Sequence, residues 1–184
     1  MSKPLDVLLI TPPSRVQVYQ ELSRDFAAIE PPVWSGLIAT FLRQHSCSVA
    51  ILDAEAEGLN HQQTADRIAA IAPRLAVFVI YGQQPSASTQ CMPAGRKVCE
   101  ILTALADIPT LVMGTHPSAL PKRTLLEEPY TYVCQGEGPA TILGLVIALR
   151  APQHSLREVP GLWHMEKGVP VGNAPAQLLT NLDC

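Results

Sequence analysis

The chain has 184 residues, of which 47% are hydrophobic and 16% charged, and its formal net charge at pH 7 is -3. This length suits one domain with a substantial core, and the weak negative charge argues against a broad surface for nucleic acid or anionic lipid. The cysteines, at positions 47, 91, 99, 134 and 184, match no zinc or iron–sulfur spacing. No segment reaches the roughly 18 apolar residues that a transmembrane helix needs. We therefore expect a cytoplasmic protein with reduced thiols that binds neither nucleic acid nor membrane.

Short apolar runs followed by turn residues predict five β-strands, at residues 6–11, 48–53, 75–81, 110–114 and 130–135. The first four are nearly continuous in Val, Ile, Leu and Phe, which is typical of strands buried on both faces. Apolar residues at helical spacing follow them, at residues 32–45, 61–71, 92–106, 120–127 and 140–150. This alternation predicts an α/β fold of flavodoxin-like (Rossmann-like) type, with a doubly wound parallel five-stranded sheet of order 2-1-3-4-5.

The composition changes after residue 150. Residues 151–158 are polar and indicate a linker, whereas residues 159–163 and 169–171, around a Lys167-Gly168 turn, predict a small β-hairpin. Residues 173–184 have little to fold around. We expect a domain at residues 1–150, followed at residues 151–184 by a linker and a hairpin that lead into a further domain.

Four loops follow the carboxyl ends of the predicted strands, where open parallel sheets bind their ligands. Small residues there let a bulky planar ligand approach the backbone, and hydroxyls hold its polar periphery. The alternative for Gly82 and Gly114 is that each only serves a tight turn. The candidate binding residues are Thr11, Pro12, Pro13 and Ser14; Tyr81, Gly82, Gln83, Gln84, Ser86 and Ser88; Gly114, Thr115, His116, Ser118, Ala119 and Leu120; and Gln135, Gly136, Glu137 and Gly138.

The first of these loops disfavours the common ligands of such folds. A dinucleotide or flavin phosphate site needs backbone amides there, and Pro12 and Pro13 supply no N–H donors. A phosphoacceptor domain would need acidic residues where Thr11 and Tyr81 stand, and no Walker loop is present.

An ordered set of motifs carries a family resemblance. It comprises Ile10-Thr11-Pro12-Pro13 and residues 31–39 (PPVWSGLIA), 49–54 (VAILDA), 114–121 (GTHPSALP) and 133–141 (VCQGEGPAT). The set resembles the N-terminal cobalamin-binding domains of cobalamin-dependent radical S-adenosylmethionine (radical-SAM) enzymes, over about residues 5–182. Residues 159–162 and 173–175 also resemble the lead-in to the catalytic barrel of that family. Each motif is weak alone, and the ordered set is fairly specific.

The resemblance implies a cobalamin cofactor with its corrin ring over the carboxyl edge of the sheet and its nucleotide tail beside the third and fourth strands. Gly82, Ser86 and Gly114 would leave room for the tail, with residues 136–138 near its end. Glu137 would either accept hydrogen bonds from ribose hydroxyls or loop amides, or stabilise the start of the following helix.

The resemblance also implies an unusual cobalt environment. Cobalamin domains of methionine synthase and the mutases carry Asp-x-His-x-x-Gly after the first strand, and its histidine ligates cobalt. Pro12 and Pro13 stand there in this chain, so we expect no histidine ligand, with Tyr81, Gln83 or Gln84 covering the lower face. His116 is a lesser candidate ligand, the alternative being a hydrogen bond to the cofactor periphery or to a helix terminus. Trp34 is expected in the core under the first helix, or bordering the corrin.

The cysteines include no C-x-x-x-C-x-x-C run. We therefore expect no catalytic residue and no protein metal ligand in this chain. The [4Fe–4S] cluster and S-adenosylmethionine would belong to a C-terminal radical-SAM domain of the same polypeptide, missing here, which would act as a methyltransferase. The alternatives are a stand-alone flavodoxin-like module that binds a nucleotide or flavin, and a structural interaction domain with a degenerate pocket.

Overall fold

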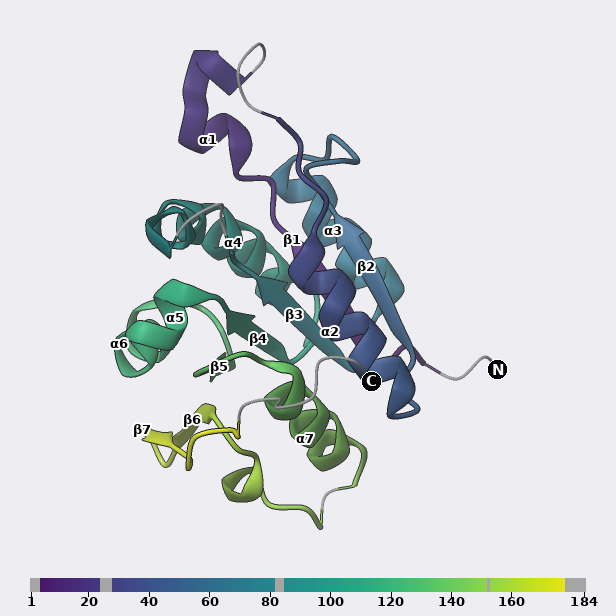
Figure 1. Cartoon of the computed structure of the whole chain (residues 1–184), viewed down its shortest axis with the longest axis vertical. Helices are drawn as coiled ribbons and strands as arrows, with labels where there is room; N and C mark the ends of the chain where they lie inside the picture. Colours follow the sequence, from purple (N-terminus) through teal and green to yellow (C-terminus); the bar gives the residue numbers. More distant parts are fainter. Residues whose placement is uncertain (1–3, 24–27, 82–84, 152, 178–184) are drawn as a thin grey trace.

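The computed structural model describes residues 4–23, 28–81, 85–151 and 153–177, which are built around one twisted sheet (Figure 1). Within these residues the strand order is β2-β1-β3-β4-β5-β6-β7. The strands are β1 (Val7–Thr11), β2 (Val49–Asp53), β3 (Leu75–Val79), β4 (Thr110–Met113), β5 (Tyr132–Cys134), β6 (Leu162–Glu166) and β7 (Val169–Gly172). β1 to β5 pair in parallel, and β6 and β7 continue the sheet antiparallel.

The predicted order 2-1-3-4-5 and the α/β class are confirmed. The predicted number of five strands is too low, because the hairpin pairs with β5 and extends the same sheet. Its register places His164 opposite Tyr132 and Leu162 opposite Cys134. The predicted division of the chain at residue 150 stays a prediction.

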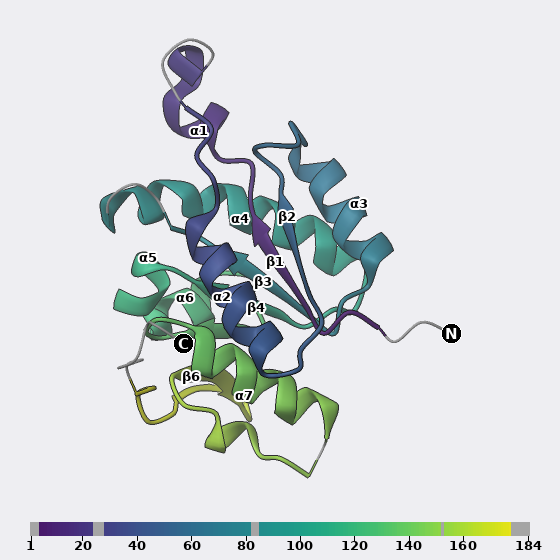
Figure 2. The same ribbon diagram turned by 45° about the vertical axis from the view of Figure 1, so that its right-hand side comes forward.

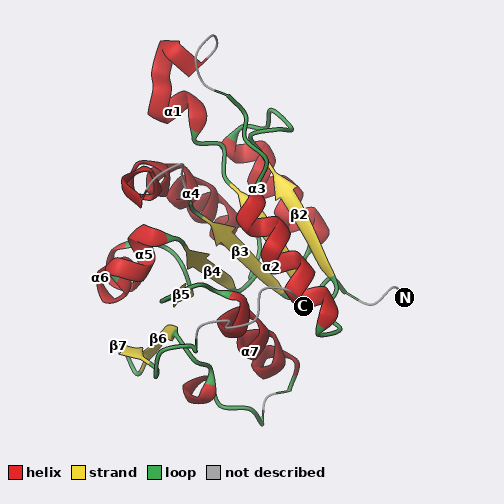
Figure 3. Ribbon diagram, in the orientation of Figure 1, coloured by secondary structure: helices red, strands yellow, loops and turns green. Residues whose placement is uncertain are grey.

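Helices cover both faces of the sheet (Figure 3). On one face lie α2 (Val33–Gln44) and α7 (Pro139–Arg150), and on the other lie α3 (His61–Ile71), α4 (Pro85–Leu105) and α6 (Pro121–Glu127). Two short helices, α1 (Arg15–Tyr19) and α5 (Thr115–Ala119), stand at the carboxyl edge, and 3-10 turns occupy Gln20–Ser23 and Leu156–Glu158. Among the described residues, no helix combines the length and the apolarity that crossing a bilayer requires.

The core follows from alternation along the buried strands. In β1, Val7 and Leu9 pack under α2 and α7, whereas Leu8 and Ile10 pack under α3 and α4. The edge strand β2 departs from the expected full burial, since Ile51 is 37% exposed and has strand neighbours on one side only.

Three helical segments differ from expectation. α4 begins at Pro85 instead of residue 92 and carries Pro93 in its interior, which removes one backbone hydrogen bond. α5 is a single short helix inside a segment expected to be a loop. α1 projects away from the sheet and buries no residue, so its sequence has no apolar stripe to detect (Figure 2).

Candidate functional site

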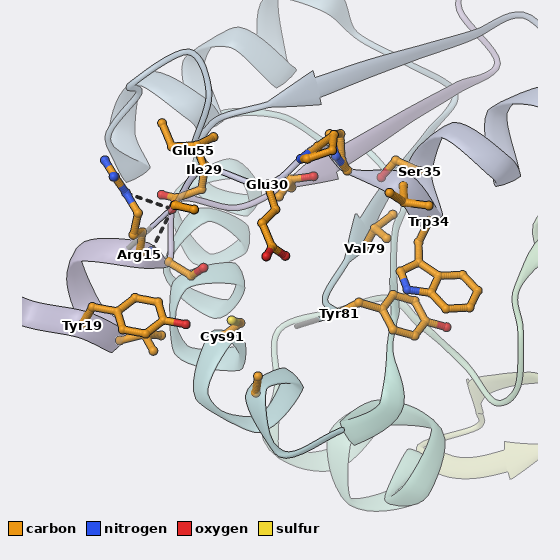
Figure 4. A pocket seen from close by; sticks show the side chains of 18 residues that line it. Arg15, Tyr19, Ile29, Glu30, Trp34, Ser35, Glu55, Val79, Tyr81 and Cys91 are labelled. Carbon is orange, nitrogen blue, oxygen red and sulfur yellow. Dashed lines mark hydrogen bonds and ion pairs between the residues drawn. The ribbon is translucent and has the colours of Figure 1, made fainter. Parts of the chain in front are cut away.

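Two hollows open at the edge of the sheet where the parallel strands end. The first, of about 380 Å³, lies at the switch point between β1 and β3 and is bounded by α1, α2 and α4 (Figure 4). The second, of about 330 Å³, lies beyond the ends of β3, β4 and β5. In a doubly wound sheet this edge is where ligands bind.

The first hollow carries charged side chains on its α1 side. The backbone N–H of Arg15 donates to Glu55 Oε2 at 3.0 Å, and the Arg15 guanidinium Nε lies 3.8 Å from the same oxygen. Burial raises the pKa of Glu55, and Arg15 opposes that rise. Burial also raises the pKa of the Cys91 thiol on α4, which leaves this sulfur protonated and weakly nucleophilic at neutral pH.

The second hollow is lined mainly by small residues. The backbone N–H of Gly136 donates to Ser118 Oγ at 2.9 Å, which ties the loop after β5 to α5. Thr115 and Ser118 place hydroxyl groups in the wall, and Gly114 and Gly136 leave the backbone uncovered. Such a wall suits a ligand that approaches the backbone closely while its polar groups are held by hydroxyls.

A buried scaffold supports the second hollow. The hydroxyl of Ser88, which is 0% exposed, donates to the Ile80 carbonyl oxygen at 2.6 Å and accepts from the His116 backbone N–H at 3.1 Å. Gly114 has a φ of 145°, and a Cβ there would collide with the same Ile80 carbonyl. Gly114 therefore serves a tight turn and also lines the second hollow.

His116 belongs to this scaffold more than to either hollow. Its Nδ1 lies 2.9 Å from Thr89 Oγ1, so the ring is directed towards α4. It lines neither the first nor the second hollow.

The structure brings most of the predicted site residues to this edge. Thr11, Ser14 and Tyr81 line the first hollow, and Tyr81, Gly114, Thr115, Ser118, Ala119, Gly136 and Glu137 line the second. Ala119, Leu120 and Gln135 line an outer hollow beside Trp163. Pro12, Pro13, Ser88, His116 and Gly138 line none of the three. Gly82, Gln83 and Gln84 lie outside the described residues, as does the side chain of Ser86.

Several wall residues were missed from the sequence. Trp34 was expected in the core or at the border of the corrin, and it was not among the predicted site residues. It is 47% exposed, lines both hollows and stacks on Tyr81, so its predicted place in the core is wrong. Cys91 enters the wall because α4 begins earlier than predicted. Glu55 carried a usable signal, since it follows the second strand and that strand ends at the same edge.

In a comparison with protein families, residues 22–146 match the family described as B12 binding domain. The match spans more than half of the chain. This chain belongs to the B12-binding domain family. The carboxyl edge of this B12-binding domain thus holds the two hollows just described.

Solved structures share the fold of the B12-binding domain. The radical S-adenosylmethionine methyltransferase TsrM from Kitasatospora setae, with tryptophan substrate and a SAM analogue bound, matches with a TM-score of 0.73 and 18% identity. The cobalamin-dependent S-adenosylmethionine radical enzyme OxsB, with aqua-cobalamin and S-adenosylmethionine bound, matches with a TM-score of 0.68 and 17% identity. These matches cover 93% and 96% of this chain but only 30% and 23% of the two enzymes. A comparison with curated protein sequences finds no match.

The shape of the carboxyl edge fits cobalamin. The two hollows meet at a shared boundary and so offer room for a ring and for a nucleotide tail, the second with a glycine-lined wall. Among the described residues, no cluster of His, Cys, Asp and Glu could hold a bare metal ion.

Proposed function

We propose that this B12-binding domain holds cobalamin for a cobalamin-dependent radical-SAM enzyme that transfers methyl groups. The observation that carries the proposal is the pair of hollows at the carboxyl edge, in a chain whose family binds B12. Bound cobalamin would supply a cobalt centre able to carry the methyl group. The remaining chemistry would come from a C-terminal radical-SAM domain of the same polypeptide, with its [4Fe–4S] cluster and S-adenosylmethionine.

The second hollow is the proposed place for the nucleotide tail. Gly114 and Gly136 let the tail approach the backbone, and the hydroxyls of Thr115 and Ser118 lie in the same wall. Glu137 is exposed at the rim, where its carboxylate can accept hydrogen bonds from sugar hydroxyls.

The first hollow is the proposed place for the lower face of the ring. Thr11, Ser14 and Tyr81 face it, and no histidine does so among the described residues. Burial raises the pKa of Tyr81 to about 12, so its phenol stays protonated and neutral at physiological pH. A neutral phenol is a poor metal ligand but a good hydrogen-bond donor. Because no histidine lines this hollow among the described residues, we propose that cobalt has no nitrogen ligand from this chain.

Filling the second hollow tests this assignment. Ala119 is exposed in its wall, so Ala119→Phe should weaken binding of hydroxocobalamin about tenfold or more without unfolding the chain. The matched control is Ala104→Phe, because Ala104 is also exposed on a helix but lies near the end of α4, at the opposite edge of the sheet.

The measurement is a titration followed by gel filtration and visible absorption. Wild type and Ala104→Phe should retain about one corrin per chain, and Ala119→Phe should not. Equal affinity of all three proteins would remove the second hollow from the proposal. Retention of flavin mononucleotide in place of corrin would instead favour a flavin-binding module.

A further inference from the structure

One aromatic pair forms the boundary between the two hollows. The rings of Trp34 and Tyr81 are stacked, with centroids 4.7 Å apart and an interplanar angle of 19°. Among the residues that the structure describes, these are the only two that line both hollows. Figure 4 shows them side by side at the border of the first hollow. A ligand that occupies both hollows at once must therefore pass this pair.

The backbone that carries each aromatic side chain is fixed by packing or by hydrogen bonds. Trp34 lies in the first turn of α2, directly before the buried Ser35 and one turn before Ile38 in the core. Tyr81 follows Ile80, whose N–H donates to the Met113 carbonyl oxygen at 2.8 Å. The pair therefore stands at a fixed position relative to the sheet.

The pair is nevertheless only partly covered. Trp34 is 47% exposed, so stacking on Tyr81 leaves much of the indole surface in water. Tryptophan is largely buried in most proteins, and a half-exposed indole beside a hollow offers a flat apolar surface to a ligand. Covering that surface with a ligand would be favourable.

We propose, resting on the function proposed above, that Trp34 and Tyr81 are positioning residues that separate the ring space from the tail space. Cobalamin packs against the pair from both hollows, and the pair fixes how its ring and its tail lie relative to each other. A ligand that needs only one hollow depends on the pair much less.

Binding of whole and truncated cofactor tests this role. The probes are hydroxocobalamin and cobinamide, which has the corrin ring but lacks the nucleotide tail. Trp34→Ala should weaken cobalamin binding about three- to tenfold and change cobinamide binding by less than about twofold. Trp34→Phe, which keeps an aromatic ring, should restore most of the affinity.

The matched control is Leu37→Ala. Leu37 is 59% exposed on the same helix and lines neither hollow, so its removal should leave both affinities unchanged. Thermal unfolding of each variant checks that the fold is kept.

A second measurement needs no change to the proposed pair. The chain has only two tryptophans, Trp34 and Trp163, so its NMR spectrum contains two indole N–H signals, assigned with Trp163→Phe. The Trp163 indole donates to Gln135 Oε1 at 2.8 Å, outside both hollows, and serves as an internal reference. Addition of Co(III) cobalamin to the full chain should shift the Trp34 signal strongly and the Trp163 signal little.

The outcomes separate the two proposals. If wild type retains no cobalamin, the proposed function fails and this inference fails with it. If wild type binds cobalamin but Trp34→Ala binds it equally well, or loses cobinamide binding to the same degree, only the inference fails. An unshifted Trp34 signal in a saturated complex overturns it as well.

Discussion

Asp6 is a buried carboxylate that holds together three segments at the amino edge of the sheet. It lies next to β1 and is 1% exposed. Its Oδ2 accepts from the Ser48 N–H at 2.8 Å and from Ser48 Oγ at 2.7 Å, and its Oδ1 accepts from Arg150 Nε at 3.0 Å. Arg74 Nε lies 3.7 Å from Oδ1. This carboxylate therefore links the start of β1 with the turn before β2 and the end of α7.

Replacing Asp6 by Asn should destabilise the chain by about 2–3 kcal/mol at pH 7. Removing one partner of a buried ion pair typically costs about 3–5 kcal/mol, because the other charge is left without compensation. Here the side chains of Arg150 and Arg74 are 29% and 32% exposed, so water can partly solvate them and the cost lies lower. For a chain of this size, the loss corresponds to a fall in Tm of about 4–12 °C.

The same cluster predicts a pH dependence. Burial alone would raise the pKa of Asp6, but the hydrogen bonds from Arg150 and Ser48 and the charge of Arg150 hold it well below its usual value. The folded chain thus binds this proton less tightly than the unfolded chain does. The stabilisation is complete above the unfolded pKa, about 4, and falls below it by up to about 1.4 kcal/mol per pH unit.

Urea denaturation of wild type and Asp6→Asn at pH 7 and pH 3 measures both effects. The difference in free energy of unfolding should be large at pH 7 and clearly smaller at pH 3. Asp107→Asn is the control, because Asp107 is an exposed aspartate in the loop before β4, near the same edge. Its change should stay within about 0.5 kcal/mol. A gap that is the same at both pH values, or no gap at all, would refute this account of Asp6.

Two further predictions concern the site. Gly114→Ala should lower stability by at least about 2 kcal/mol in thermal unfolding, because the new Cβ meets the Ile80 carbonyl at a positive φ, whereas Gly36→Ala, in open space on α2, should not destabilise. Because the His116 ring bonds Thr89, reduced Co(II) cobalamin on the chain should show no nitrogen splitting in its electron paramagnetic resonance spectrum. Splitting that vanishes in His116→Ala would identify His116 as the ligand, and splitting that survives would identify the cofactor's own base.

The strand order could be predicted because the buried strands leave a strong local signal. Residues 75–79 are apolar throughout and buried on both faces, and the helices between such strands force parallel crossovers. The addition of the hairpin to the sheet could not be predicted, since β6 pairs antiparallel with β5 and the rule for parallel crossovers does not determine that contact. The projecting α1 left no signal because it buries no residue.

Site residues could be predicted where they directly follow the end of a strand. Tyr81, Gly114 and Gly136 follow three different strands, and parallel pairing brings them to one edge. Residues that come from helices were missed, because their place depends on how each helix is rotated on the sheet. Trp34 is the example, since the spacing along α2 places it in the same stripe as Ile38, yet one is half-exposed and the other buried.

The residues of the carboxyl edge divide into two groups that a sequence does not distinguish. Ser88 and Gly114 support the backbone of the carboxyl edge itself. Ser88 donates a hydrogen bond to the Ile80 carbonyl, and Gly114 leaves room for the same carbonyl. Ala119 and Trp34 lie exposed above that scaffold, where substitution changes the wall without removing a support. Loss of binding in the first group can therefore reflect a damaged fold, whereas loss of binding in the second reports on the ligand. A large residue at Gly114 would fill the second hollow but would also displace the Ile80 carbonyl, so Ala119 is the position at which the second hollow is tested.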